Sequence, residues 1–172
     1  MHRASALRDL KKLTRNQWLG LTAAWPDELW LSVELARYWA DRGIRLDEAE
    51  TLARDALTAL GRQRWLSWDQ SRAARTGRGL DRLVYLDCLG WVLYRQGERA
   101  AGRELLAQAR SQADAAGQPQ PLNLYHLGVV YYEQGQDADA LRVVDMALAL
   151  DPTLGPAKLL RERLTGRGRQ TT

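Results

Sequence analysis

Residues 121–154, PLNLYHLGVVYYEQGQDADALRVVDMALALDPTL, decide the fold of this chain of 172 residues. Their apolar residues recur at spacings of three and four, which places them on one face of a helix. Gly135 divides the stretch into two helical halves, because glycine readily adopts the left-handed conformation that ends many helices. Asp137 is expected to cap the start of the second half. The stretch therefore predicts two antiparallel helices, which together form a helical hairpin.

The same pattern occurs again upstream. Residues 86–97 and 124–135 both read Leu-x-x-Leu-Gly-x-Val-x-Tyr-x-Gln-Gly, at an offset of 38 residues. A third and weaker copy covers residues 35–43, and Asp47 is placed to cap the helix that follows it. Each copy ends in a glycine and precedes a second helical pattern. The sequence therefore predicts a stack of helical hairpins.

Small residues are placed where the two helices of each hairpin should meet. A small residue opposite a small residue lets two helices approach closely. The expected pairs are Ala36 with Ala49, Gly90 with Gly102, and Gly128 with Ala140.

The repeated stretches carry a resemblance to tetratricopeptide-repeat proteins, whose repeat usually has 34 residues. Residues 121–154 match the signature of this family in order, at Leu127-Gly128, Tyr131, Gly135, Ala140, Ala147 and Asp151-Pro152. Two further segments match it less fully: 83–116 at Leu89-Gly90, Gly97 and Ala109, and 29–62 at Leu35-Ala36, Trp39, Ala49 and Ala56. The resemblance implies an all-α fold, a right-handed α-solenoid of about three hairpins with N-terminal and C-terminal capping helices.

The repeat alignment predicts one domain over residues 1–172, divided into consecutive units. These units are an N-terminal helix or degenerate half repeat at 5–25, repeat 1 at 27–61, an insertion at 62–80, repeat 2 at 81–117, repeat 3 at 120–153, a capping helix at 154–165 and a disordered tail at 166–172.

The insertion contains the stretch RQRWLSWDQSRAARTGRG, residues 62–79. Trp65 and Trp68 lie three residues apart, which favours a short amphipathic helix, and Gly77-Arg-Gly79 would form its flexible exit. Two interpretations remain open. The tryptophans either pack against the second helix of repeat 1 or form a lid or second contact surface beside a groove.

The resemblance also implies a binding surface. First helices of such repeats line a concave groove, which usually binds a peptide or a helix of another protein. Transferred to this chain, the partner-binding residues are Trp30, Arg37, Asp87, Trp91, Tyr94, Arg95, Tyr125, Val129 and Tyr132, with Trp65 and Trp68 from the insertion and with Val33, Asp41, Val84, Leu122 and Glu133 beside them.

This predicted groove is aromatic and nearly neutral, which favours an apolar or aromatic ligand segment. Relatives that clamp the C-terminal carboxylate of chaperones line the groove with Lys, Arg and Asn. The matching positions here are Val33, Arg37, Asp87, Trp91 and Val129, so that specificity is not expected. The alternative is that Trp91 and Tyr125 pack between adjacent repeats, or that the end of the chain itself fills the groove.

Catalytic chemistry is not indicated. The chain has no phosphate-binding loop, no zinc-protease motif and no nucleophile elbow. His126 would need a partner in reach, for which Asp87 on the neighbouring helix is a candidate, and Cys88 suits a buried thiol. We therefore expect a protein-interaction adaptor or scaffold that is not an enzyme, with no cofactor and no metal.

Charge and hydropathy leave two other functions open. The net charge is +4, with basic surpluses in residues 1–20, 61–83 and 154–172, so an Arg-rich nucleic-acid contact is one alternative. Self-assembly through exposed end helices is the other, and a monomer or weak homo-oligomer is expected. No stretch resembles a signal peptide or a membrane span, which makes a cytoplasmic location the expectation.

Overall fold

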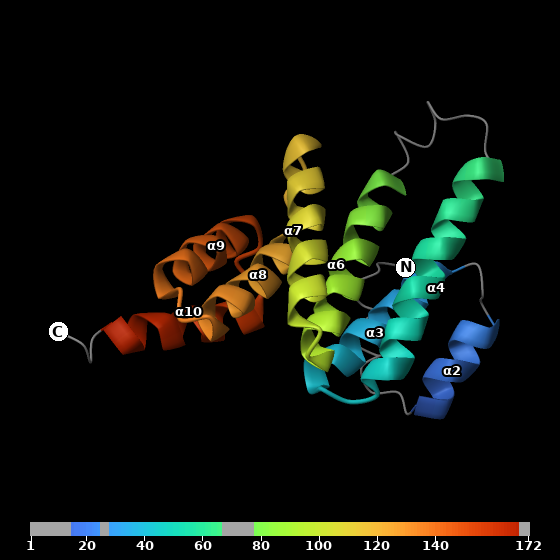
Figure 1. Cartoon of the computed structure of the whole chain (residues 1–172), viewed down its shortest axis with the longest axis horizontal. Helices are drawn as coiled ribbons and strands as arrows, with labels where there is room; N and C mark the ends of the chain where they lie inside the picture. Colours follow the sequence, from blue (N-terminus) through green and yellow to red (C-terminus); the bar gives the residue numbers. More distant parts are fainter. Residues whose placement is uncertain (1–14, 25–27, 67–77, 169–172) are drawn as a thin grey trace.

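The protein is described here by a computed structural model that places residues 15–24, 28–66 and 78–168. Within these ranges the chain forms eight α-helices and no strand (Figure 1). The helices are α2 (Arg15–Ala24), α3 (Leu29–Arg42), α4 (Leu46–Leu66), α6 (Arg78–Gln96), α7 (Arg99–Ala115), α8 (Pro121–Glu133), α9 (Asp137–Leu150) and α10 (Gly155–Gly168). They stack from α2 at one end to α10 at the other, which confirms the predicted all-α repeat solenoid.

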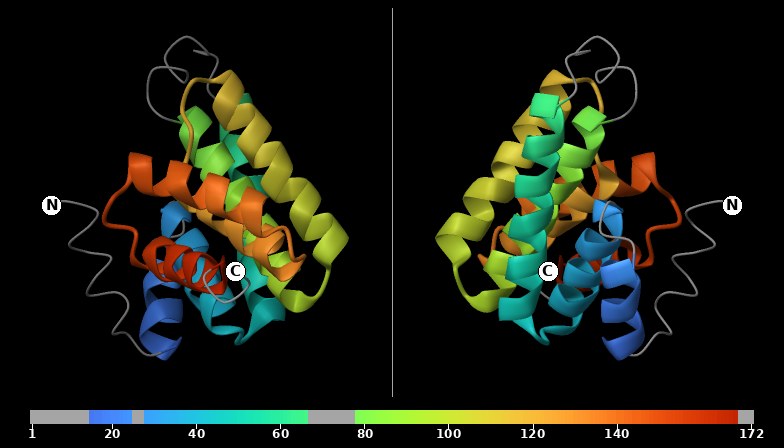
Figure 2. Two further views of the ribbon diagram at one scale, coloured as in Figure 1. Left: turned by 90° about the vertical axis from the view of Figure 1, so that its left-hand side faces the viewer. Right: turned by 90° about the vertical axis from the view of Figure 1, so that its right-hand side faces the viewer.

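Three antiparallel hairpins make up the stack: α3 with α4, α6 with α7, and α8 with α9. Glycines at the predicted positions form the three hairpin turns, with φ values of 64° at Gly43, 104° at Gly97 and 74° at Gly135. These values lie in the left-handed region, where a side chain is disfavoured. In both end views of Figure 2, α7 lies on one side of the stack, and α2 and α10 lie on the opposite side.

The helix starts differ from the prediction. Asp137 is the first residue of α9, and Gln136 before it makes no side-chain capping bond. Asp47 lies inside the first turn of α4, where its Oδ1 accepts a hydrogen bond of 3.1 Å from Gln96 Nε2. The predicted capping role is therefore wrong for both residues. An acid in the first turn stabilises a helix through the helix dipole instead.

Helix extends into segments that the sequence set apart. The helix α4 continues to Leu66 and α6 begins at Arg78, so both ends of the 62–80 insertion are helical. Gly79 lies in the first turn of α6, which contradicts a flexible exit at that residue. At the other end of the chain, α10 runs through Gly168, into the segment predicted to be disordered.

The close approach of α6 and α7 depends on two glycines. A Cβ atom built on Gly102 would lie 2.5 Å from the main-chain nitrogen of Tyr94 and 2.7 Å from the carbonyl oxygen of Gly90. The predicted meeting of Gly90 with Gly102 is confirmed. Gly128 differs, because its nearest neighbour is Val144, 2.6 Å from a built Cβ, and not Ala140.

The core has a large part and a smaller part. The large cluster joins the first two hairpins and includes Leu35, Trp39, Val92 and Leu106. The smaller cluster joins the third hairpin to α10 through Val144, Ala157, Leu160 and Leu164. Because α10 packs through one face only, Leu159 on its other side is 59% exposed. The helix α10 therefore covers the end of the third hairpin, as expected of a capping helix.

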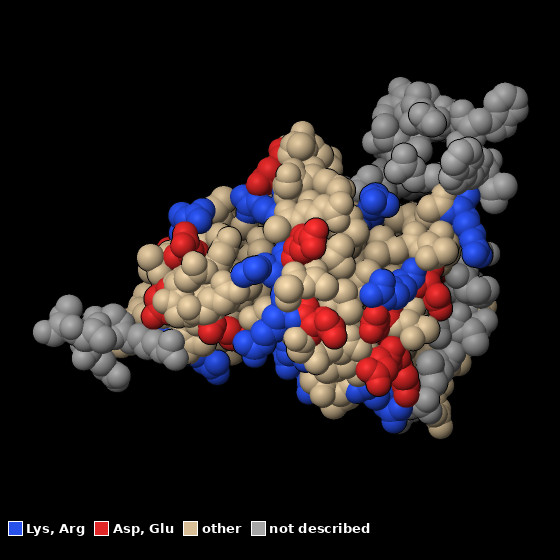
Figure 3. Space-filling model, in the orientation of Figure 1, with Lys and Arg blue, Asp and Glu red and all other residues tan. Residues whose placement is uncertain are grey.

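Charges of both signs cover the surface. On the face shown in Figure 3, acidic and basic side chains are interspersed. Several form exposed pairs along one helix, such as Arg45 with Glu48 and Arg54 with Glu50. None of the helices in the described ranges is both long and apolar enough to span a membrane.

Candidate functional site: a concave pocket

Several residues predicted to line an open groove are buried instead. Val33 and Trp91 are each 2% exposed, and Asp87 and Tyr94 are each 4% exposed. A partner segment cannot reach these four side chains on the structure as it stands. Their burial has a common reason, since each packs where neighbouring hairpins meet.

Trp91 shows how this packing works. Its Nε1 donates a hydrogen bond of 2.9 Å to Asp41 Oδ1 on α3. Its ring stacks on the ring of His126 on α8, with centroids 4.4 Å apart and planes 7° apart. The guanidinium carbon of Arg95 lies 5.3 Å from the Trp91 ring centroid. One aromatic side chain on α6 thus contacts both neighbouring hairpins, which agrees with the alternative that Trp91 packs between repeats.

A buried polar cluster lies beside Trp91. His126 Nδ1 is 3.0 Å from Asp87 Oδ2, as the sequence analysis considered, and His126 is fully buried. Asn123 Nδ2 donates to Asp87 Oδ1 at 2.9 Å and to the main-chain oxygen of Leu106 at 3.0 Å. Sequence reasoning missed Asn123, because nothing in a helical pattern marks one amide as buried. The cluster ties α6, α7 and α8 together and has no exposed face for a substrate.

Two other buried groups are also structural. The Tyr94 hydroxyl donates to Glu133 Oε2 at 2.9 Å, and burial together with this bond raises the pKa of Tyr94 to about 12. The Cys88 thiol donates to the main-chain oxygen of Val33 at 3.4 Å. Burial raises the pKa of this thiol, so it stays protonated and unreactive at neutral pH.

The remaining predicted groove residues are accessible to different degrees. Asp41 and Glu133 are exposed, whereas the others are partly buried: Trp30, Arg37, Val84, Arg95, Leu122, Tyr125, Val129 and Tyr132. The side chain of Trp65, at the end of α4, and the whole of Trp68 lie outside the described residues. Their predicted contact role stays a prediction.

Part of this accessible set forms a pocket of about 180 Å³, which we call the concave pocket. Its lining residues are Trp18 of α2, Glu34, Arg37, Tyr38 and Asp41 of α3, Leu122 of α8, and Leu154 and Pro156 at the start of α10. The pocket therefore brings the first helices of the chain together with its last two repeat units. Arg37, Asp41 and Leu122 belong to the predicted groove.

Sequence reasoning missed the other lining residues for identifiable reasons. Tyr38 lies one position beyond the face assigned to the groove, and Trp18 was placed in a degenerate unit. Pro156 follows Leu122 by 34 residues, so the two occupy equivalent positions in successive repeat units. Extending the repeat alignment into the capping helix would have found Pro156.

Charged groups of both signs surround the pocket. The Arg37 guanidinium pairs with the Glu34 carboxylate, and the two side chains are 22% and 16% exposed. The guanidinium carbon of Arg42 lies 3.9 Å from the Tyr38 ring centroid. Near the pocket, burial raises the pKa of Tyr125, and the negative charge of Asp41 adds to this effect. The pocket thus offers hydrogen-bonding groups on one wall and apolar groups on the other.

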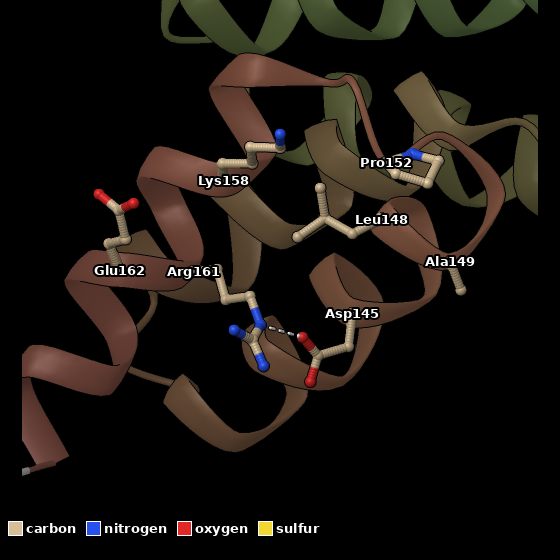
Figure 4. Close-up of a pocket in the computed structure, with 7 residues that line it drawn as sticks. All are labelled: Asp145, Leu148, Ala149, Pro152, Lys158, Arg161 and Glu162. Atoms are coloured by element: carbon tan, nitrogen blue, oxygen red, sulfur yellow. Dashed lines mark hydrogen bonds and ion pairs between the residues drawn. The ribbon is translucent and has the colours of Figure 1, made fainter.

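A second pocket, of about 470 Å³, lies between α9 and α10. Figure 4 shows Asp145 and Arg161 pointing toward each other across it, where Arg161 Nε donates to Asp145 Oδ1 at 2.6 Å. Lys158 and Glu162 also line it, beside Leu148, Ala149 and Pro152. The charged lining suits a solvent-facing cap, and this pocket takes no part in the site.

Metal chemistry finds no support in this arrangement. Across the described ranges, no group of three His, Cys, Asp or Glu side chains is placed to hold a metal ion.

The fold and the pocket define an α-helical repeat protein with a small polar pocket on its concave side. A family model described as tetratricopeptide repeat matches residues 121–154, which span α8 and α9. The match confirms the resemblance noted in the sequence for this segment. Proteins with such repeats generally bind other proteins. No curated protein and no solved structure matches the chain.

Proposed function

We propose that this chain is a non-enzymatic interaction module that holds a segment of a partner protein at the concave pocket. The observation that carries this proposal is the pocket itself, which combines polar groups of α3 with apolar groups of α8 and α10. A binding site of this kind needs apolar contact area together with a few placed polar groups. The matched repeat supports the proposal, because such repeats generally serve protein–protein interaction.

The accessible rings beside the pocket extend the proposed contact surface. Tyr125, Val129 and Tyr132 lie on α8, are partly buried and follow the groove positions of that helix. Rigid rings give a large contact area at a low cost in conformational entropy. We propose that the segment enters the pocket with one side chain and lies along α8 with its neighbours.

The alternatives have weaker support. Nucleic acid binding needs a concentration of basic side chains, whereas both signs are interspersed on the face in Figure 3. Self-assembly draws support from Met146, Leu150 and Leu159 near the C-terminal end, which are 37%, 47% and 59% exposed. These residues border charged groups of α10, which does not favour a close contact between helices.

A peptide selection tests the proposal. Displayed random peptides are selected on the full chain, and the winning peptides are measured again on Tyr38→Ala. Loss of a pocket wall should weaken these peptides about tenfold or more, as expected when a contact worth over 1.4 kcal/mol is removed.

Arg37→Ala and Arg142→Ala form a matched pair of controls. Both arginines pair with an acid three residues earlier on the same helix, but only Arg37 lines the pocket. Arg37→Ala should weaken the selected peptides and Arg142→Ala should not. Equal binding to the wild type, Tyr38→Ala and Arg37→Ala would place the interaction elsewhere and end the proposal.

A further inference from the structure

The concave pocket contains a hydrogen-bond donor that nothing in the described part of the chain satisfies. Trp18 lines the pocket and is only 2% exposed. Its indole Nε1 is buried, and none of the described residues accepts a hydrogen bond from it. A buried polar group without a partner is unfavourable, and such groups in folded proteins are usually satisfied by a ligand or by water. The pocket therefore favours a ligand that carries a hydrogen-bond acceptor.

The opposite requirement comes from α3. The Asp41 side chain lines the same pocket, and its Oδ1 already accepts from Trp91 Nε1. Glu34 is engaged by Arg37, so their charges offset each other. What remains on this wall is one uncompensated carboxylate. The pocket therefore favours a ligand that also donates a hydrogen bond.

Charge decides between the possible ligands. A carboxylate would satisfy Trp18 but would lie close to the negative charge of Asp41, and like charges at short range are unfavourable. An ammonium group would pair with Asp41 but would leave the Trp18 donor without an acceptor. A neutral carboxamide has both a carbonyl acceptor and an NH₂ donor, so it meets both needs without a net charge.

From this pairing we infer that the concave pocket recognises a carboxamide, supplied by an Asn or Gln side chain of the partner segment. The inference rests on the proposed function and names the side chain that the pocket takes. The carbonyl oxygen accepts from Trp18 Nε1, and the NH₂ group donates to Asp41. The methylene groups of the side chain pack on Leu122, Leu154 and Pro156, which form the apolar wall.

Three small molecules of the same size test the inference on the full chain. Propionamide reproduces the end of a Gln side chain, propionate that of Glu, and propylammonium carries a cation of similar length. Each is titrated while the indole Nε1–H resonance of Trp18 is followed by NMR. The resonance is assigned by its absence in Trp18→Phe, or by through-bond assignment of α2 if that variant does not fold.

Propionamide is expected to move the Trp18 indole resonance in a saturable way, and to bind about fivefold or more tightly than the other two, as one added hydrogen bond allows. The indole resonance of buried Trp39, which lies outside the pocket lining, is the internal control. In Asp41→Asn the preference for propionamide over propionate should shrink, because the repelling charge is gone. Tighter binding of propionate or propylammonium, or no saturable shift with propionamide, would overturn the inference.

The peptide selection separates this inference from the proposed function. If selected peptides depend on Tyr38 but carry no Asn or Gln that tolerates no replacement, the interaction site stands and the carboxamide inference fails. If Asn or Gln recurs at one position, its replacement by Glu or Met should weaken binding to the wild type about fivefold or more and have little effect on Trp18→Phe. If no peptide depends on the pocket, the proposed function fails first.

Discussion

His126 lies flat on Trp91, with ring centroids 4.4 Å apart and an angle of 7° between the ring planes. The contact joins the third hairpin to the second, and Trp91 reaches back to Asp41 on the first. An aromatic residue at a groove position thus holds three successive repeat units in place. It organises the wall of the concave pocket without lining it.

We predict that Trp91→Ala lowers stability rather than binding alone. Removing a fully packed ring should reduce the free energy of unfolding by about 3–5 kcal/mol, because the cavity would not close. Urea unfolding followed by circular dichroism measures this loss. Leu159→Ala is the control, since that side chain is 59% exposed and its loss should cost less than about 0.5 kcal/mol. A Trp91→Ala protein as stable as the wild type would contradict the structural role.

Gly102→Ala should separate α6 from α7. The added Cβ would lie 2.5 Å from the Tyr94 nitrogen, so the main chain must move, at a cost of about 1–3 kcal/mol. Gly61→Ala is the matched control, because Gly61 lies inside α4 with nothing within 4 Å of a built Cβ. That change should stabilise the protein by about 0.5–1 kcal/mol. Thermal unfolding of both variants gives the comparison, and a loss of similar size in the two would argue against a close contact.

His126→Leu should leave the Asp87 carboxylate buried with only Asn123 as its side-chain partner. Breaking one side of a buried pair costs about 3–5 kcal/mol, because the remaining charge is poorly compensated. Adding Asp87→Asn removes that charge and should recover part of the loss. Urea unfolding of the two single variants and the double variant tests this coupling. Strictly additive losses would show that the two groups do not interact.

Stability should fall at alkaline pH through Tyr94. Its pKa is about 12 in the folded protein and about 10 in an unfolded chain. A group whose pKa is raised by folding stabilises the folded state fully below the unfolded value. That contribution is lost as the pH rises from about 10 to about 12. The free energy of unfolding of Tyr94→Phe, measured across this range, should decline less steeply than that of the wild type. An identical decline would contradict the role given to Tyr94.

The hairpins and their turns were readable from the sequence. Apolar spacing placed the helices, and Gly43, Gly97 and Gly135 marked the turns, because local backbone geometry depends on neighbouring residues. The meeting of Gly90 with Gly102 followed from the same repeat. Helix caps were predicted less well, since Asp47 and Asp137 both lie inside helices instead of before them.

The site was only partly readable. Arg37, Asp41 and Leu122 were assigned to the groove from the repeat pattern and do line the pocket. Asp87, Trp91 and Tyr94 were assigned on the same grounds and are buried. The pattern shows which face of a helix a residue occupies. It does not show how close the next hairpin lies, and this distance determines whether that face is open.

By itself, the sequence determined that this chain is a stack of helical hairpins, because a period of three to four residues and a glycine turn are local properties. Only the tertiary structure decided which side chains a partner can reach. Trp91 was closed off by Asp41 and His126, which lie 50 and 35 positions away in the chain. The concave pocket formed where Trp18 came together with α3, Leu122 and Pro156. Contacts between residues so distant in the sequence depend on how all the hairpins pack, and no single repeat encodes them.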